Sequence, residues 1–564
     1  MPDVPDLGTA WEKRFMQLVR THVRRDPPEL DYHILRLPIV REAHVRLGAR
    51  KIPRLPLRPA DTLPVHEALE AFMMYWQVLE AANACGGATA TLGLAPFDGI
   101  WQWIKFLLPS SGNMRDDGRR DHPRPKFVDG HFSCALVPLE YILRRHLASA
   151  LMYEEGRNRC LAQPDFTNVF LDVYCSYHSG VRTVIDAQVS HTMILVLSQL
   201  LDNPSTSPRL LAEIRAYDAQ HPAKFLHTML DTMLSFFDHS FDHSLVPPYL
   251  SLISTLLAFD DMSHNSVAHG GVQKLCGILM KTVAYPVGEE IAPSLTITTH
   301  CVSQLIRLAS QYPSAVEDIL NVRILAYVIS AVFDENDCKR PVGWRVPPAE
   351  LIRDLLSSCL VWPCHITMLT REVRKLRILR CLGDDPPVLP ELNLFVYQLS
   401  RREKARKELK SILSGPKRCH NQGMCPGGGA ETIRCKMCRC GRAFYCSREC
   451  QKMHWRMAHR ETCGTADERR YMKDENPRLS LQPFERCLLK KLAWDFAEEA
   501  NLHRSYETVI GNAVLIRFHV GPELGASAME DPLSPTDPPR VYAQVRRGSE
   551  ESTVLMGSLG AAFW

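Results

Sequence analysis

The chain has 564 residues, too many for a single hydrophobic core, and we expect about three or four domains. Its hydrophobic fraction of 45%, charged fraction of 23% and net charge of +4 indicate an ordinary globular protein. No apolar run reaches the roughly 18 residues that a membrane crossing needs, and the first residues lack a secretory signal pattern. We therefore expect an intracellular protein with no membrane partner.

The N-terminal part, residues 1–126, predicts helical segments separated by polar, proline-bearing stretches. Residues 65–83 place Leu69, Phe72 and Trp76 at spacings of three and four, which predicts an amphipathic helix. Residues 109–126 have no apolar periodicity and predict a solvated loop or linker. This part is the first expected domain, an N-terminal helical region.

Residues 127–400 predict one helix after another. In residues 222–237, apolar side chains recur every four positions from Phe225 to Phe237, and residues 294–333 continue the pattern. Several segments open on Pro or Ser, which suit a first helical turn. Stacked helical pairs over this length favour an α-solenoid, because the core of a bundle stops growing at a smaller size.

One short stretch of this region resembles a known helical repeat. Residues 265–280, "NSVAHGGVQKLCGILM", resemble the armadillo-repeat pattern, in which a Gly pair turns the chain into a leucine-rich helix. We expect a mainly α protein: an armadillo-like helical region at 127–400, then a small zinc-binding module and a short α/β C-terminal extension.

Cysteine usage separates one segment from the rest of the chain. Of nineteen cysteines, eight lie between Cys419 and Cys463, and the others are scattered singly. Scattered ones such as Cys276 and Cys359 sit among apolar residues, where a reduced thiol behaves as a small hydrophobe. Clustered cysteines in such a chain usually bind metal.

Four residue pairs in this cluster offer eight ligands, enough for two tetrahedral Zn²⁺ ions. Cys-x2-Cys lets a tight turn aim two sulfurs at one ion, and helical residues four apart share a face. A segment this short buries too little apolar area to fold alone, so metal binding supplies its folding energy. The candidate pairs are Cys419 and Cys425, Cys435 and Cys438, Cys446 and Cys450, and His459 and Cys463.

The stretch "YCSRECQKMHWRMAHRETC", residues 445–463, resembles the second half of a MYND-type zinc finger. The resemblance implies a finger at 419–463 that binds two zinc ions in an interleaved way. The first implied site is Cys419, Cys425, Cys446 and Cys450. The second implied site is Cys435, Cys438, His459 and Cys463.

Two features depart from the family's pattern. The gap between Cys419 and Cys425 is wider than in the family, and Cys440 competes for a place in the second pair. Cys440 keeps the family's distance to Cys446, whereas Cys435 and Cys438 keep the Cys-x2-Cys turn that we favour. The alternative stays open. We expect His454, which also lies near the ligands, at the surface.

Positive charge gathers around the cluster: residues 401–464 hold sixteen Lys and Arg against five Asp and Glu. Residues 401–418 predict a basic linker helix that ends at Ser-Gly-Pro. A row of cations at every fourth position follows on the finger helix, and it either meets an acidic partner or phosphates or is a solvated face. The row is Arg448, Lys452, Arg456 and Arg460.

The last expected domain spans residues 470–564. Residues 484–504 predict an amphipathic helix, and residues 513–520, 540–548 and 552–557 predict strands around a proline-rich loop at 531–539.

The resemblance implies a non-enzymatic interaction protein that docks a protein partner, a proline- and leucine-containing peptide, in transcriptional or chromatin regulation, with no small-molecule substrate. One alternative is a SET-type lysine methyltransferase carrying the same finger. The helical pattern before the finger and the lack of an Asn-His-Ser motif after residue 463 argue against it. A second alternative is nucleic-acid binding through the basic segment, although base-reading spacing is absent.

Overall fold

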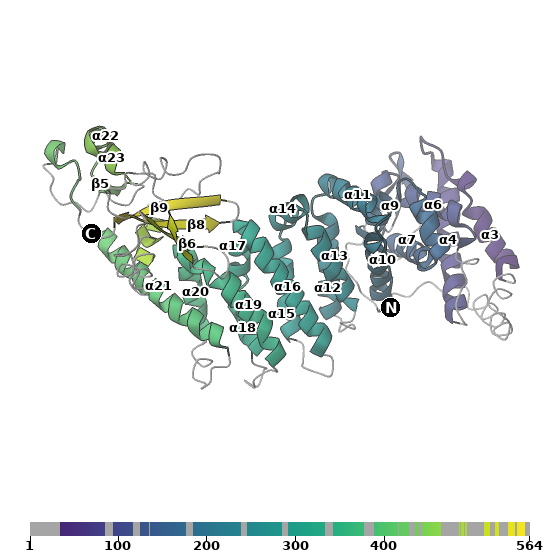
Figure 1. Cartoon of the computed structure of the whole chain (residues 1–564). Coiled ribbons are helices and arrows are strands. Elements are labelled where there is room, and N and C mark those ends of the chain that lie inside the picture. The colour runs from purple at the N-terminus through teal and green to yellow at the C-terminus, as the bar shows by residue number, and fades with distance from the viewer. Residues whose placement is uncertain are drawn as a thin grey trace. The chain divides into compact units, whose positions relative to one another are not determined.

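The protein is mainly α-helical, as predicted, and divides into two compact units, Met1–Gly271 and Val272–Trp564 (Figure 1). The domain boundaries expected from the sequence stay predictions. The computed structural model describes residues 34–84, 94–116, 125–134, 136–175, 184–238, 245–284, 291–332, 342–376, 389–415, 417–427, 435–438, 443–463, 484–485, 487–489, 491–492, 513–518, 525–529, 540–547 and 550–558.

The described residues of the first unit lie mainly in helices. They are α3 (Pro38–Arg46), α4 (Thr62–Ala84), α6 (Phe97–Leu107), α7 (Leu136–Met152), α8 (Glu154–Leu161), α9 (Phe166–Cys175), α10 (Val184–Asp202), α11 (Ser207–Gln220), α12 (Lys224–Asp238), α13 (Pro247–Leu257) and α14 (Asp260–Ala268). Short 3-10 turns are η1 (Ala49–Lys51), η2 (Pro59–Asp61) and η3 (Pro109–Ser111). Helix α10 packs against α7 and α13, and α11 packs against α9 and α14.

The apolar side chains of the predicted four-residue periodicity lie in the core of the first unit. Phe225, Met229 and Met233 of α12 are fully buried. Figure 1 shows α10, α12 and α13 side by side, the arrangement in which such a stripe finds apolar neighbours on adjacent helices. The predicted helix at 65–83 lies inside α4, where Leu69 and Phe72 are buried.

A small sheet in the first unit was not expected. Strand β3 (His131–Cys134) pairs in parallel with β1 (Met114–Asp116) and antiparallel with β2 (Lys126–Val128). The prediction of a solvated loop over 109–126 was therefore wrong at Met114–Asp116. Each residue of β1 pairs with a residue 18 positions further along the chain, as Met114 does with Phe132, beyond the reach of local periodicity.

The Gly pair of the armadillo-like stretch makes the turn that its sequence predicts. Gly270 has φ of 89°, in the left-handed region that glycine favours, and follows the end of α14. Helix α15 (Gly271–Ala284) begins at the next residue, where an added Cβ would lie 2.1 Å from Ser266 Oγ. The turn is present, but the repeat class of the helical region stays a prediction.

The second unit begins as a further series of helices. They are α15, α16 (Ile291–Gln311), α17 (Pro313–Asn321), α18 (Ile324–Val332), α19 (Val346–Glu350), α20 (Pro363–Lys375) and α21 (Pro390–Ser414), with the 3-10 turns η5 (Val342–Arg345) and η7 (Ser358–Val361) and the π turn η6 (Leu351–Leu356). Helix α16 packs against α17 and α19, and α20 packs against α21. A break between α17 and α18 places Arg323 at φ of 60°.

Three of the four described C-terminal strands were predicted. They form a sheet in the order β7 (Gly525–Met529), β6 (Ala513–Phe518), β8 (Arg540–Arg547) and β9 (Glu550–Ser558). Strand β6 is antiparallel to β7 and parallel to β8, and β9 is antiparallel to β8. Strand β7 was not predicted. The proline-rich loop at 531–539 and most of the predicted helix at 484–504 lie outside the described residues.

Among the described residues, no helix combines the length and the apolar character that a membrane crossing requires.

Candidate metal centre

The cysteine cluster folds as a short loop, a small hairpin and an irregular helix. The elements are η9 (Gln422–Met424), β4 (Lys436–Met437), β5 (Phe444–Tyr445), α22 (Arg448–His454), the π turn η10 (Trp455–His459) and α23 (Arg460–Thr462). Each element is only two to seven residues long. Backbone hydrogen bonds within elements this short cannot hold them together, so the contacts between them are decisive.

Strand β5 is the central piece of this arrangement. It pairs antiparallel with β4, and Cys438 N donates to Ala443 O at 2.7 Å. On its other side, His420 N donates to Phe444 O at 2.8 Å, and Phe444 N donates to His420 Nδ1 at 3.1 Å. These bonds place the loop that carries Cys419 beside the strand that leads into Cys446.

The structure gathers four cysteines into a first group: Cys419, Cys425, Cys446 and Cys450. Their Sγ atoms all lie within 4.8 Å of one another, with 3.5 Å from Cys446 to both Cys425 and Cys450. These distances are far beyond the roughly 2.05 Å of a disulfide. Sulfurs at the corners of a tetrahedron around Zn²⁺ lie about 3.8 Å apart, given a Zn–S distance of about 2.3 Å. The group has the size of a four-thiolate zinc site.

The start of α22 sets the aim of two of these sulfurs. Ser447 caps the helix, its Oγ accepting from Cys450 N at 3.2 Å, so that Cys446 and Cys450 flank the first turn. Hydrogen bonds with the thiol of Cys425 and to the thiol of Cys450, to which Cys446 donates, favour the protonated form of Cys446 and raise its pKa. A bound cation would reverse that effect, because each thiol releases its proton and binds the metal as a thiolate.

A second group consists of Cys438, His459 and Cys463. All three are buried, and His459 Nε2 lies 3.3 Å from Cys438 Sγ. The π turn η10 contributes to this geometry, because its wider coil ends at His459 and Cys463 follows four residues later. Three ligand atoms within 4.8 Å of one another supply three corners of a tetrahedral site.

Cys435, predicted as the fourth ligand of this second site, lies elsewhere. It is half-buried, and its Sγ donates weakly to Lys417 O at 3.6 Å. Burial raises the pKa of its thiol, and the thiols of Cys419, Cys425 and Cys450 raise it further, which places Cys435 beside the first group. This arrangement does not support its predicted role, and the competing Cys440 lies outside the described residues. The fourth ligand stays a prediction.

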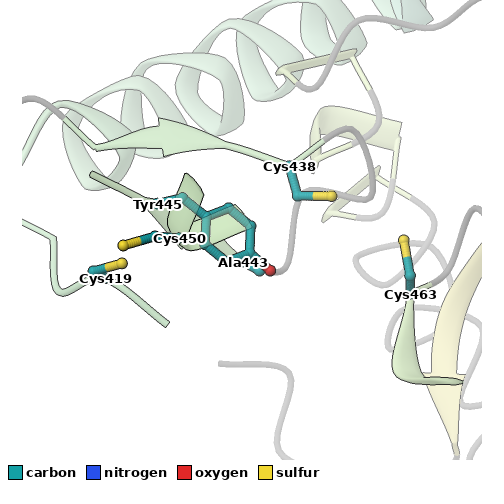
Figure 2. Close-up of a cluster of buried hydrophobic side chains, with 6 residues drawn as sticks. All are labelled: Cys419, Cys438, Ala443, Tyr445, Cys450 and Cys463. Carbon is teal, nitrogen blue, oxygen red and sulfur yellow. The ribbon is translucent and has the colours of Figure 1, made fainter. Parts of the chain in front are cut away.

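Tyr445 separates the two groups. Figure 2 shows the sulfurs of Cys419 and Cys450 on one side of its ring and those of Cys438 and Cys463 on the other. The side chain is 2% exposed. Its hydroxyl lies 2.9 Å from His454 Nδ1, so His454 is half-buried and hydrogen-bonded. His454 belongs to neither group of candidate ligands among the described residues, and it is partly exposed, since one edge of its ring meets the Tyr445 hydroxyl.

A buried polar atom without a partner fits thiolate ligands at the first group. Asn421 is 3% exposed, and its Nδ2 has no hydrogen-bond partner among the described residues. An amide donor two residues after Cys419 is suited to the negative charge that the thiolates carry once they bind a cation. Thiol and imidazole donors are the ligands that Zn²⁺ prefers, and the residues present fit it. Neither Asn421 nor Tyr445 was marked by the sequence, since each is defined by burial.

Comparisons with known proteins agree with this geometry. Residues 418–463 match the family model described as MYND finger, as the sequence resemblance predicted. The chain therefore carries a MYND finger, with Cys and His groups that are able to bind zinc and a helical region upstream. A search of curated proteins gave no match for the chain, and a search of solved structures gave none.

Proposed function

We propose that this protein is a non-enzymatic interaction protein whose two-zinc MYND finger docks a peptide of a protein partner, while the helical region acts as a scaffold. The observation that carries the proposal is the bracing of one hairpin by two groups of metal-ligand side chains, one on each side of Tyr445. MYND fingers are protein-interaction modules, and this one has the ligand types to be held rigid by zinc.

Rigidity is what the metal adds to such a surface. When bound, zinc cross-links loop, hairpin and helix, and structural sites of this kind contribute on the order of 10–16 kcal/mol to folding. The chain's own residues do the rest: Ser447 fixes the helix start, and Tyr445 fills the space between the sites. A surface ordered in advance docks an extended peptide without a large ordering cost.

The finer parts of the proposal have separate support. The proposed count of two zinc ions is supported by the two groups of candidate ligands. The proposed proline- and leucine-containing peptide is supported by the family resemblance. A reducing, intracellular setting is supported by the described cysteines, which form no disulfide with one another, even among the closely spaced thiols of the first group.

The test is zinc-dependent selection of peptides. The full chain is loaded with zinc, its metal content per chain is measured by native mass spectrometry, and a displayed library of random short peptides is selected on loaded and zinc-stripped protein. We expect two zincs per chain and a family of peptides enriched only on the loaded form. Absence of zinc, or enrichment that is the same on both forms, contradicts the proposal.

The enzyme alternative has its own test. A SET-type methyltransferase binds S-adenosylmethionine, so calorimetric titration of the loaded protein with that cofactor separates the two functions. We expect no heat of binding. Binding together with methyl transfer to lysine-containing peptides would replace the interaction function by an enzymatic one.

A further inference from the structure

Four cations form a row along the helix of the finger: Arg448, Lys452, Arg456 and Arg460. All four are exposed. Within the part of the chain that the structure describes, none of these four side chains forms an ion pair. Glu449 is near enough to Arg448 and Lys452 for their positive charges to stabilise its carboxylate. Four cations held close together on a short helix repel one another, a cost that an anionic partner removes.

The π turn keeps this row narrow. In an uninterrupted α-helix, residues four apart drift by about 40° around the axis, so three such steps would spread the cations over about 120°. The wider coil of Trp455–His459 takes more residues for each turn and offsets part of that drift between Lys452 and Arg460. The same turn that brings His459 to its ligand group thus aligns the cations, over about 18 Å at α-helical rise.

A second row, one residue further along, has an apolar centre and acidic ends. Met457 is 59% exposed and Met453 is half-buried, while Glu449 and Glu461 are exposed at the two ends. Methionine side chains adapt to different apolar partners, which makes them common on peptide-binding surfaces. A surface with a large exposed apolar side chain next to cations that make no ion pair favours a partner that offers both apolar and acidic groups.

We propose that these two rows form a docking face for an acidic peptide of a protein partner, with carboxylates on the cations and an apolar side chain on Met453 and Met457. This inference rests on the proposed function and adds to it the face and the chemistry of the partner. Charge complementarity carries it: the face presents four cations against two carboxylates.

The arrangement favours a peptide over a nucleic acid. A phosphate backbone carries charge at every step, so along this face it would meet the carboxylates of Glu449 and Glu461 and gain nothing from exposed Met457. A peptide distributes its carboxylates and its apolar side chain separately. It therefore satisfies both rows at once.

The experiment uses the peptides enriched on the zinc-loaded full chain. The test variant carries Lys452→Glu and Arg456→Glu, and the control carries Lys404→Glu and Lys410→Glu, the same total charge change at two exposed sites of α21 outside the finger. We expect acidic peptides with an apolar residue, bound about tenfold or more weakly by the test variant and unchanged by the control. Met457→Ser weakens binding several-fold, and added salt weakens it too. Zinc content equal to that of the wild type excludes a folding defect in each variant.

Three outcomes overturn the inference and are distinguishable. Enriched peptides that bind the test variant as well as the wild type dock elsewhere on the finger, and the proposed function stands without this face. A DNA duplex or single-stranded RNA that displaces the peptides and itself loses affinity for the test variant assigns the face to nucleic acid. No zinc-dependent enrichment at all removes the proposed function together with the docking face.

Discussion

The helical region and the finger bury different chemistry. In the helices the core consists of large apolar and aromatic side chains such as Phe225, Tyr249 and Tyr327, each fully buried. In the finger the buried side chains are mostly thiols and an imidazole arranged around Tyr445. Burial of apolar surface, at roughly 25 cal/mol for each Å², accounts for the first kind of core, whereas the second needs a metal to hold it.

Cysteine has a different role in each of these two regions. Cys160 and Cys301 are buried in the helical region, where burial raises the pKa of each thiol to about 12 and keeps it neutral. Cys419 and Cys450 are just as buried, but each has other thiols within 4.8 Å. The same side chain is therefore a small hydrophobe in one region and a candidate metal ligand in the other, and its neighbours decide which.

The largest expected effect comes from removing zinc. A strong chelator added to the loaded protein should unfold the finger and leave the helices intact, because only the finger depends on ligand bonds for its folding energy, on the order of 10 kcal/mol. Hydrogen exchange measures this: the amides of Cys438 and Phe444 lose protection, and those of α12 keep theirs. Loss of protection in α12 as well would show that the two regions fold as one.

Matched cysteine substitutions sharpen the contrast. Cys450→Ser should remove one zinc per chain, since it deletes a ligand of the first group. Cys301→Ser should leave the zinc content unchanged and lower the stability of the helical region by about 1–3 kcal/mol, because a hydroxyl replaces a thiol in an apolar site. Native mass spectrometry and thermal melting give the two readouts. A zinc lost from Cys301→Ser would break the distinction between the regions.

Tyr445 tests how much ordinary packing adds inside the finger. Tyr445→Ala removes the ring between the two groups. The lost packing costs about 3–5 kcal/mol, so zinc affinity should fall by a factor of roughly 100 or more. Tyr445→Phe keeps the ring and loses only the hydrogen bond to His454. Losing that bond costs about 1 kcal/mol, so zinc affinity should fall about fivefold. Competition with a chelator of known affinity measures both. Equal effects would mean that the hydroxyl, not the ring, stabilises the finger.

The smallest effect concerns pH and has opposite signs in the two regions. Burial raises the pKa of Glu372 to about 7, although its carboxylate accepts a hydrogen bond from Leu325 N at 3.1 Å. The folded state then holds a proton that the unfolded state, with a pKa near 4.5, releases, so stability falls as pH rises from about 4.5 to 7. The finger should instead lose zinc as pH falls, because protons compete for its ligands.

Glu372→Gln isolates the contribution of that carboxyl group. The amide keeps an oxygen for Leu325 N and cannot titrate, so the melting temperature of the helices should vary less between pH 5 and pH 8 than in the wild type. Glu317→Gln, at an exposed carboxylate of α17 in the same unit, is the control and should leave the pH profile as it is. An unchanged profile in Glu372→Gln would place the dependence on another group.

Local patterns in the sequence were enough to predict the helical stripe of α12, the strands β6, β8 and β9, and the eight-cysteine segment that matches a MYND finger. These features follow from periodicity and spacing over a few residues, which fix the face of a helix or the aim of a ligand pair. Strand β1 was missed because its partner is distant in the chain.

Which of these local segments contact one another depends on the tertiary fold. Closing β5 against both β4 and His420 brings Cys425 to within 3.5 Å of Cys446, twenty-one positions away, and leaves Cys435 at Lys417 instead of in the second group. The same closure buries Tyr445 against His454. Spacing specifies the direction in which a side chain leaves the backbone, whereas its neighbour depends on hydrogen bonds between segments far apart in the chain.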